Sequence, residues 1–362
     1  MGEAIELAIL GRGAVEPNPR VGALALCEGV VVGRGWHRFY GSSHAEVEAL
    51  ADARAKGAKP DAVVVTMEPC STAVGVDGKK TPACTEALIE AGVERVIIGT
   101  VDPDPRHQGR GLAMLEEAGI EVDAGVLASR CQAINQSFDR WLGLDRPWTI
   151  AKYAMTIDGK TAAPTGEARW ISGKESQRRT HELRSRCDAV VIGFRTAQMD
   201  DPLLTIRHVE GDQPIRIVID PEAEIGVESK LVCSADEHPL WLVVSTNADA
   251  DRTERLQGLG VKVVHCAGQG RRLDLLDAWR ELYRQGLRRV MVEGGGELLA
   301  QLMGCGCIDQ ILAFVAPKMI GGKTAPTPLG GEGKPLMADA WSLDEMTWER
   351  SGEDLAITAF IL

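Results

Sequence analysis

Three short motifs that lie far apart in the sequence carry a set of metal ligands, and they constrain the fold because they must meet. H-A-E at residues 44–46 is followed by E-P-C at 68–70 and by T-P-A-C at 81–84. The imidazole of His44 and the thiolates of Cys70 and Cys84 are three ligands for tetrahedral zinc, which leaves a fourth position for water, as in catalytic zinc sites. The fold must therefore bring these three side chains to one point.

Glu46 has the position of a proton shuttle. In a helix that begins at His44, residues two apart point in diverging directions, so Glu46 lies beside the metal without binding it. Zinc lowers the pKa of bound water to roughly 7, and a neighbouring carboxylate can then move protons to a leaving amine. Zinc deaminases of nucleobases and nucleotides share this pattern, although their second Cys usually follows the first after two residues and thirteen intervene here. A single Cys is more often a buried apolar side chain, but the combined motifs predict hydrolytic deamination.

Length and charge limit the other functions that are open to the chain. Its 362 residues exceed one typical core and fit two domains. The net charge of −12 disfavours nucleic acid and anionic membranes as partners, and no apolar run reaches bilayer length. The first residues lack the pattern of a secretory signal, and an odd number of cysteines, nine, fits a reducing compartment. We expect a cytoplasmic enzyme that acts on a small polar molecule.

Helix-like and strand-like segments alternate through residues 1–144, which indicates an α/β domain with helices packed on a sheet. We expect helices at 4–10, 44–56, 82–91 and 111–118, and strands at 21–27, 30–35, 61–66 and 95–100. Thr81 and Pro82 are suited to the N-cap and first position of the third helix. Cys84 would then lie in its first turn, where the helix dipole favours a thiolate.

Gly, Asp and Pro at 143–147 interrupt this pattern, and a second α/β domain is expected over residues 147–362. Its expected strands are 148–155, 188–193, 215–220, 240–245, 261–265, 289–293 and 308–316, and its expected helices are 174–186, 273–285 and 297–303. The strand at 289–293 runs into three glycines, Gly294 to Gly296, and then into a helix. Backbone amides at such a junction can hold a phosphate, and a simple tight turn is the alternative.

The motifs taken together resemble one family over almost the whole chain, the bifunctional riboflavin-biosynthesis deaminase-reductases. The matching stretches are P-N-P-R-V-G at 17–22, G-W-H at 35–37, H-A-E-V at 44–47, E-P-C-S at 68–71, T-P-A-C at 81–84, D-G-K at 158–160, G-E at 166–167, W-I at 170–171 and D-D-P-L-L-T-x-R at 200–207. The resemblance implies an N-terminal cytidine-deaminase-like, three-layer domain and a C-terminal dihydrofolate-reductase-like domain that uses NADPH. It further implies two reactions on a phosphorylated pyrimidine, hydrolysis of the 2-amino group and then reduction of the ribosyl side chain to ribityl.

The resemblance assigns roles residue by residue in the deaminase domain. His44, Cys70 and Cys84 become the zinc ligands and Glu46 the proton shuttle. The implied substrate ligands are Asn18, Lys80 and Asp102. Lys80 would face the phosphate as a point charge. Asp102 stands in D-P-D-P, where the family more often has D-P-N-P.

In the reductase domain the resemblance implies two groups of ligands. The cofactor ligands would be Lys152, Trp170, Thr196, Asp200, Gly295 and Gly296, and the substrate ligands Arg184, Leu204, Arg207 and Glu293. Two arginines on one phosphate would give charge-assisted, bidentate hydrogen bonds. The alternatives are a solvated surface role for each arginine and a core aromatic role for Trp170.

The sequence departs from the family pattern at two places. Residues 71–79 form a longer spacer that lacks the His usually found after Cys-Ser, and Ala168 replaces the Ser of G-E-S-x-W. Two alternatives therefore stay open, a paralogue that acts on a related pyrimidine nucleotide, and a reductase with a structural zinc domain. A tRNA deaminase is disfavoured by the acidic charge and the second domain. Exposed sheet edges of the second domain predict a homo-oligomer.

Overall fold

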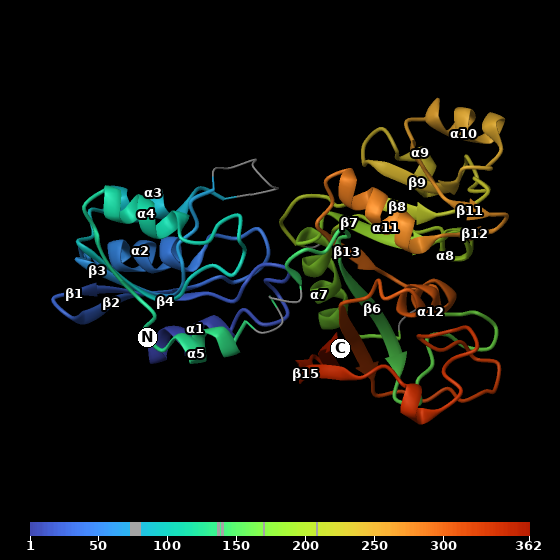
Figure 1. Ribbon diagram of the computed structural model, residues 1–362. Helices are drawn as coiled ribbons and strands as arrows, with labels where there is room; N and C mark the ends of the chain where they lie inside the picture. Colours follow the sequence, from blue (N-terminus) through green and yellow to red (C-terminus); the bar gives the residue numbers. More distant parts are fainter. Residues whose placement is uncertain (73–80, 136–137, 139–140, 169–170, 208) are drawn as a thin grey trace. The chain divides into compact units, whose positions relative to one another are not determined.

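The computed structural model describes the chain apart from residues 73–80, 136–137, 139–140, 169–170 and 208. It divides into two compact units, Met1–Leu144 and Asp145–Leu362, each with its own sheet (Figure 1). Lys80 and Trp170 lie outside the described residues. In the described parts of the chain, no helix has the length and apolar character needed to cross a bilayer.

The first unit is built on a five-stranded sheet in the order β2-β1-β3-β4-β5. The strand bounds are β1 Gly22–Cys27, β2 Val30–Trp36, β3 Ala62–Met67, β4 Arg95–Thr100 and β5 Glu121–Ala124. β1 is antiparallel to both β2 and β3, whereas β3, β4 and β5 are parallel. The expected strand pair at 21–35 is thus confirmed, and β5, which is short and polar, was not predicted.

Helices cover both faces of this sheet, as the three-layer prediction requires (Figure 1). The helices are α1 Gly2–Ile9, α2 Ala45–Ala55, α3 Cys84–Ala91, α4 Arg110–Glu117 and α5 Ala128–Ala133. α2, α3 and α4 share one core with the strands, in which α2 buries three alanines at the helical spacing of four. α1 packs on the opposite face through Ala4, against Leu24 and Val64. Because β3 and β4 are parallel, their carboxyl ends meet at one edge of the sheet, beside the starts of α2 and α3.

The start of α3 differs from the prediction. Its first residue is Cys84 and its N-cap is Ala83, which makes no side-chain capping bond, so the assignment of Thr81 and Pro82 was wrong. The amide of Cys84 donates to the Sγ of Cys70 at 3.3 Å, and the amide of Thr85 donates to the carbonyl oxygen of Cys70 at 3.2 Å. Cys70 therefore satisfies the free amides at this helix start, a role that a local cap would otherwise fill.

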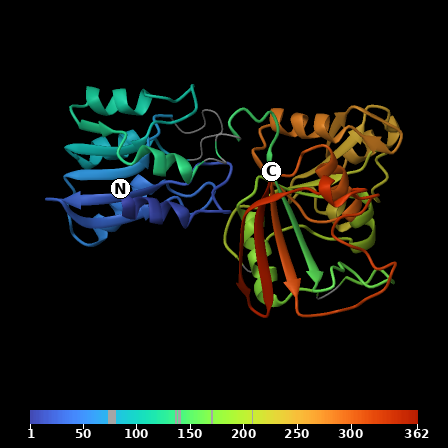
Figure 2. The ribbon, with the colours of Figure 1, turned by 60° about the horizontal axis from the view of Figure 1, so that its bottom comes forward.

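The second unit is built on a nine-stranded sheet in the order β10-β9-β8-β7-β13-β6-β14-β16-β15. The strand bounds are β6 Trp148–Thr156, β7 Ala189–Gly193, β8 Ile215–Ile219, β9 Leu240–Ser245, β10 Lys262–Cys266, β13 Arg289–Val292, β14 Gln310–Ala316, β15 Leu343–Ser351 and β16 Asp354–Ile361. The strands from β10 to β14 are parallel, and β16 and β15 add an antiparallel edge beside β14 (Figure 2). All seven expected strands are present.

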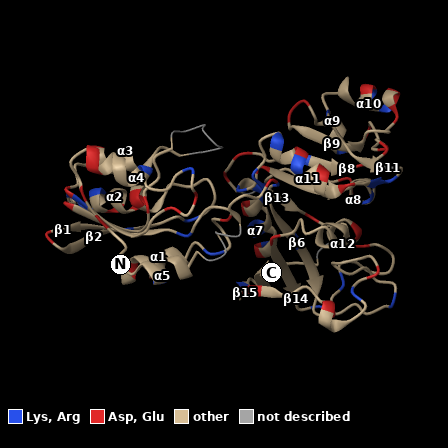
Figure 3. Ribbon diagram, in the orientation of Figure 1, with Lys and Arg blue, Asp and Glu red and all other residues tan. Residues whose placement is uncertain are grey.

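The C-terminal hairpin of β15 and β16 was missed because β15 has no apolar run and is exposed along most of its length. A small ribbon of β11 Gly268–Gln269 and β12 Arg272–Leu273 was also missed. The helices are α7 Lys174–Ser185, α8 Phe194–Asp200, α9 Lys230–Cys233, α10 Ala250–Gln257, α11 Leu275–Arg284 and α12 Gly296–Gly304, with a short 3-10 helix at Met337–Asp339. α11 and α12 bury their apolar residues in the core of this sheet. Basic and acidic residues are interspersed over the described parts of both units (Figure 3).

Candidate functional site

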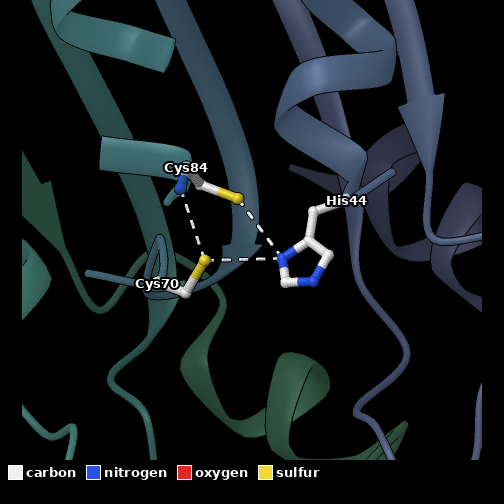
Figure 4. Close-up of side chains that lie close together, drawn as sticks. All are labelled: His44, Cys70 and Cys84. Carbon is white, nitrogen blue, oxygen red and sulfur yellow. Dashed lines mark hydrogen bonds between the residues drawn. The ribbon is translucent and has the colours of Figure 1, made fainter. Parts of the chain in front are cut away.

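His44, Cys70 and Cys84 converge at the sheet edge of the first unit (Figure 4). The Nδ1 of His44 lies 3.5 Å from the Sγ of Cys70 and 3.3 Å from the Sγ of Cys84. All three ligand atoms lie within 4.8 Å of one another. Tetrahedral zinc with ordinary Zn–N and Zn–S bond lengths separates a nitrogen and a sulfur ligand by about 3.6 Å. The donor atoms and their spacing therefore fit zinc.

The start of α2 orients both the candidate imidazole ligand and the candidate proton shuttle. His44 is the N-cap of α2 in an extended conformation, and Glu46 lies in the first turn. Glu46 is 3% exposed, and its Oε2 has no hydrogen-bond partner among the described residues. Desolvation by burial, with the nearby Cys70, raises the pKa of Glu46, although His44 opposes the shift. The ring of His37, at the end of β2, lies 5.1 Å from that of His44.

Glu68 organises the loop that follows β4. Its Oε2 accepts hydrogen bonds from the amides of Asp102 and Gly109, each at 3.0 Å, and its Oε1 accepts one from Gly111 at 2.8 Å. A Cβ on Gly111 would lie 2.1 Å from the carbonyl oxygen of Pro69, so a side chain there would force the two segments apart. The E-P-C motif therefore holds residues 101–111 beside Cys70, a role that the motif alone did not indicate.

The structure describes two of the three substrate ligands expected in this unit, Asp102 and Asn18. Asp102 lies in the loop held by Glu68, half-buried, and burial raises the pKa of its carboxyl group. Its Oδ1 accepts a hydrogen bond from the amide of Asp104 at 2.9 Å. Asn18 is half-buried in the turn between α1 and β1. The prediction for Lys80 falls outside the described residues.

In the second unit a buried ion pair joins two of the expected substrate ligands. The guanidinium of Arg184, in the last turn of α7, contacts both carboxylate oxygens of Glu293, with 2.8 Å between Nη2 and Oε2. Their side chains are 11% and 9% exposed. The Nη1 of Arg184 also donates to the carbonyl oxygen of Thr205 at 2.8 Å, which brings the segment containing Leu204 and Arg207 to the same place. Leu204 itself is buried with φ 56°, and Arg207 is exposed.

Lys152, on β6, adds a second cation to this pair. Burial lowers the pKa of Lys152, Glu293 opposes that shift, and Arg184 adds to it. Burial also opposes the ionisation of Glu293, but the charge and hydrogen bonds of Arg184, together with Lys152 and His181, lower its pKa to about 2. The cluster therefore holds an ionised carboxylate against the guanidinium of Arg184, near Lys152, at the end of β13. Sequence reasoning had placed these residues in two separate ligand groups.

The glycine-rich turn lies next to this cluster. Gly295 has φ 81° and is the N-cap of α12, and a Cβ added to it would lie 3.2 Å from the Oγ1 of Thr196. The structure thus brings Thr196, Gly295 and Gly296 together at a helix N-terminus, the geometry that favours a phosphate. Asp200 is exposed at the end of α8, and Trp170 lies outside the described residues.

Two histidines beside the candidate sites, one in each unit, escaped the sequence reasoning. The Nδ1 of His107 lies 3.2 Å from the Oγ1 of Thr72, which follows Cys70 by two residues. In the reductase unit, the Nδ1 of His181 accepts a hydrogen bond from the amide of Arg207 at 3.1 Å. A single His in a loop or helix belongs to no sequence motif. Its contact with a segment distant in sequence becomes visible only in the structure.

The first unit is a three-layer fold with a His-Cys-Cys cluster whose donor atoms fit zinc. The second unit is a largely parallel sheet with a buried ion pair. Together they are typical of a two-domain deaminase-reductase. Residues 1–100 match the cytidine and deoxycytidylate deaminase zinc-binding region, and residues 147–357 match the RibD C-terminal domain. The chain belongs to the RibD family of riboflavin-biosynthesis proteins. The resemblance seen in the motifs, the fold class and the bifunctional enzyme class are thereby confirmed.

Relatives and a solved structure cover both units. The chain is 38% identical to the riboflavin biosynthesis protein RibD of Aquifex aeolicus over 98% of its length and 95% of that protein. It is 34% identical to RibD of Actinobacillus pleuropneumoniae over 100% of its length and 94% of that protein. It is also similar to the crystal structure of a Thermotoga maritima diaminohydroxyphosphoribosylaminopyrimidine deaminase/5-amino-6-(5-phosphoribosylamino)uracil reductase, with a TM-score of 0.68, 30% identity and coverage of 100% and 97%.

Proposed function

We propose that residues 1–144 carry the deaminase and residues 147–362 the reductase of this bifunctional riboflavin-biosynthesis enzyme. The first reaction would remove an amino group from 2,5-diamino-6-(5-phosphoribosylamino)pyrimidin-4(3H)-one by hydrolysis. The second would use NADPH to reduce the ribosyl side chain and give 5-amino-6-(5-phosphoribitylamino)uracil. The convergence of His44, Cys70 and Cys84 beside a buried Glu46 carries the deaminase part of the proposal. The Thermotoga maritima relative, whose name states both activities, supports the substrates.

In the deaminase site, His44, Cys70 and Cys84 would hold the metal and Glu46 would move protons. Zinc, when bound, makes a water molecule acidic enough to attack near neutral pH. Glu46 would accept a proton from this water and deliver it to the leaving amine. Its burial suits both steps because a raised pKa makes the carboxylate a stronger proton acceptor. Asn18, Asp102 and Lys80 would orient the pyrimidine nucleotide.

Glu46→Gln is the test of the deaminase assignment. The amide keeps the shape of the side chain but cannot accept the proton, so we expect kcat for ammonia release to fall by about 10² to 10⁴. Zinc content and NADPH oxidation on the deaminated intermediate should stay at wild-type levels. Unchanged ammonia release would refute the shuttle role of Glu46. A wild-type protein that has full zinc content and reductase activity but releases no ammonia would favour the alternative in which the zinc site is structural.

In the reductase site, Arg184, Leu204, Arg207 and Glu293 would bind the substrate. The cofactor would be held by Lys152, Trp170, Thr196, Asp200, Gly295 and Gly296. NADPH, when bound, supplies the hydride, so the protein has to position its reactive carbon against the ribosyl group. The helix start at Gly296 and the neighbouring Thr196 support a phosphate of the dinucleotide at this point. The cation–carboxylate cluster supports the placement of a polar substrate beside it.

A paralogue that acts on a related pyrimidine nucleotide is the second candidate, favoured by the long segment between Cys70 and Cys84 and by Ala168. Ala168 is exposed and lacks the hydroxyl that the family pattern provides. Complementation of a riboflavin-requiring strain separates the two candidates. Growth at the rate given by an authentic deaminase-reductase supports the proposed function, and failure with full zinc content favours the paralogue.

We also propose a homo-oligomer that forms through the reductase unit, in a reducing cytoplasm. β15 is the outer strand of the nine-stranded sheet, and Met346 and Trp348 on it are 61% and 69% exposed. None of the nine cysteines, all of which lie in the described residues, forms a disulfide, which fits a reducing compartment. Trp348→Glu should lower the mass measured by light scattering to that of a single chain. The same oligomer mass in the variant and the wild type would exclude this edge.

A further inference from the structure

His107 connects the two loops that flank the candidate zinc ligands. It extends from the loop after β4, and its Nδ1 lies 3.2 Å from the Oγ1 of Thr72. Thr72 lies two residues after Cys70, at the start of the long segment that leads to Cys84. The side chain of His107 is 24% exposed, so this contact is largely shielded from water. It therefore joins the loop of Asp102 to the segment that carries one sulfur ligand.

Asp104 contacts both the backbone and the ring of His107. Its amide donates to the carbonyl oxygen of Asp104 at 2.9 Å, and its Nε2 lies 3.9 Å from the Oδ2 of the same residue. Asp104 is fixed in turn by the guanidinium of Arg106, which it meets at 2.6 to 3.0 Å. The contact with Thr72 can form with either tautomer of His107, because a threonine hydroxyl group can donate to Nδ1 or accept a hydrogen bond from it.

Glu68 and Gly111 hold the same loop against the segment that precedes Cys70. Glu68 bonds the amides of Asp102, Gly109 and Gly111, and Gly111 packs directly on Pro69. These contacts anchor the chain before Cys70. The contact of His107 with Thr72 anchors it after Cys70, so the two sets of contacts enclose the ligand.

We propose that His107 is a positioning residue of the deaminase, which sets the distance between the Asp102 loop and the Cys70 side of the zinc site. This inference rests on the proposed deaminase function. Asp102 is the proposed substrate ligand on that loop, so a loosened loop should weaken substrate binding more than it slows the chemical step. The three metal ligands keep their own supports, because Cys70 is still held by the start of α3 and His44 by α2.

The test combines His107→Ala with Thr72→Val, which removes the hydroxyl at nearly constant volume. Each variant should raise KM for the deaminase substrate roughly five- to tenfold while kcat changes less than about threefold, and the double variant should resemble the single ones. Thr72→Ser, which keeps the hydroxyl, and His107→Gln, which keeps a polar group, should recover part of the loss. Zinc content should match the wild type, and amides of residues 101–109 should exchange hydrogen faster. His265→Ala, an exposed histidine on β10, is the control.

Three results would overturn the proposal. The first is a zinc-loaded His107→Ala protein with KM within twofold of the wild type, and the second is a double variant in which the two effects multiply. The third applies if His107→Ala fails to fold: a Thr72→Val protein whose KM equals that of the wild type would then overturn the proposal. A wild-type protein without deaminase activity would instead refute the proposed function. In that case, hydrogen exchange of residues 101–109 in Thr72→Val would still test whether the contact with Thr72 positions the loop. Unchanged exchange rates would refute the positioning role of His107.

Discussion

Replacing Glu293 by Gln removes the carboxylate from the buried cluster of the reductase unit. Glu293 contacts Arg184 and lies near Lys152, and both partners of the ion pair are about one-tenth exposed. Burial by itself would raise the pKa of Glu293. The charge and hydrogen bonds of Arg184, with Lys152 and His181, outweigh burial and lower this pKa from 4.5 to about 2.

The loss of stability in Glu293→Gln can be estimated from the lowered pKa of Glu293. A pKa lowered from 4.5 to about 2 on folding corresponds to about 3 kcal/mol of stability at neutral pH, since each tenfold change in an equilibrium constant is about 1.4 kcal/mol. Glu293→Gln also leaves Arg184 and Lys152 buried next to a neutral amide. Breaking one side of a buried pair costs about 3 to 5 kcal/mol. We therefore expect the free energy of unfolding of the reductase unit to fall by about 3 kcal/mol at pH 7.

Hydrogen exchange read by mass spectrometry measures this loss in the reductase unit separately from the deaminase unit. Peptides from β7 and β13 should exchange faster in the variant. Glu222→Gln is the matched control, since its partner Arg271 is 73% exposed and such surface pairs contribute about 0 to 1 kcal/mol.

The pH dependence has a definite sign. A carboxyl group with a lowered folded-state pKa stabilises the protein above its unfolded pKa, and this contribution is lost as pH falls from 4.5 toward 2. The difference between wild type and Glu293→Gln should shrink over that range. A difference below about 1 kcal/mol at pH 7 would refute the reasoning, as would a difference that stays constant from pH 7 to pH 3.

Two further substitutions test how the fold supports each unit. Gly111→Ala places a Cβ 2.1 Å from the carbonyl oxygen of Pro69, so zinc affinity measured by competition with a chelator should fall about tenfold or more. Gly2→Ala, which meets no atom within 4 Å, should bind zinc like the wild type. Arg216→Met removes a fully buried guanidinium whose pKa burial lowers to about 10, and it takes one hydrogen-bond donor from each of the carbonyl oxygens of Leu203, Leu231, Ser234 and His238. Thermal unfolding should show a loss of about 2 to 4 kcal/mol, compared with about 0.5 kcal/mol or less for the exposed Arg255→Met.

Much of the architecture could be predicted from local patterns. Apolar strand-sized runs gave all seven parallel strands of the second unit, because strands buried on both faces have continuous apolar sequences. β15 was missed for the opposite reason, since it is exposed and is held by pairing with β16. The start of α3 was wrongly assigned because its capping partner, Cys70, is fourteen residues away in sequence.

Sequence by itself predicted the zinc ligands and Glu46, because metal chemistry requires those residue types in fixed local motifs. It also determined the two-domain organisation that the family shares. Tertiary structure decided which charges neutralise one another, as in the pair of Arg184 and Glu293, and which loop His107 secures. These contacts join residues between 35 and 109 positions apart, and no local pattern encodes a distance that the packing of the whole unit sets.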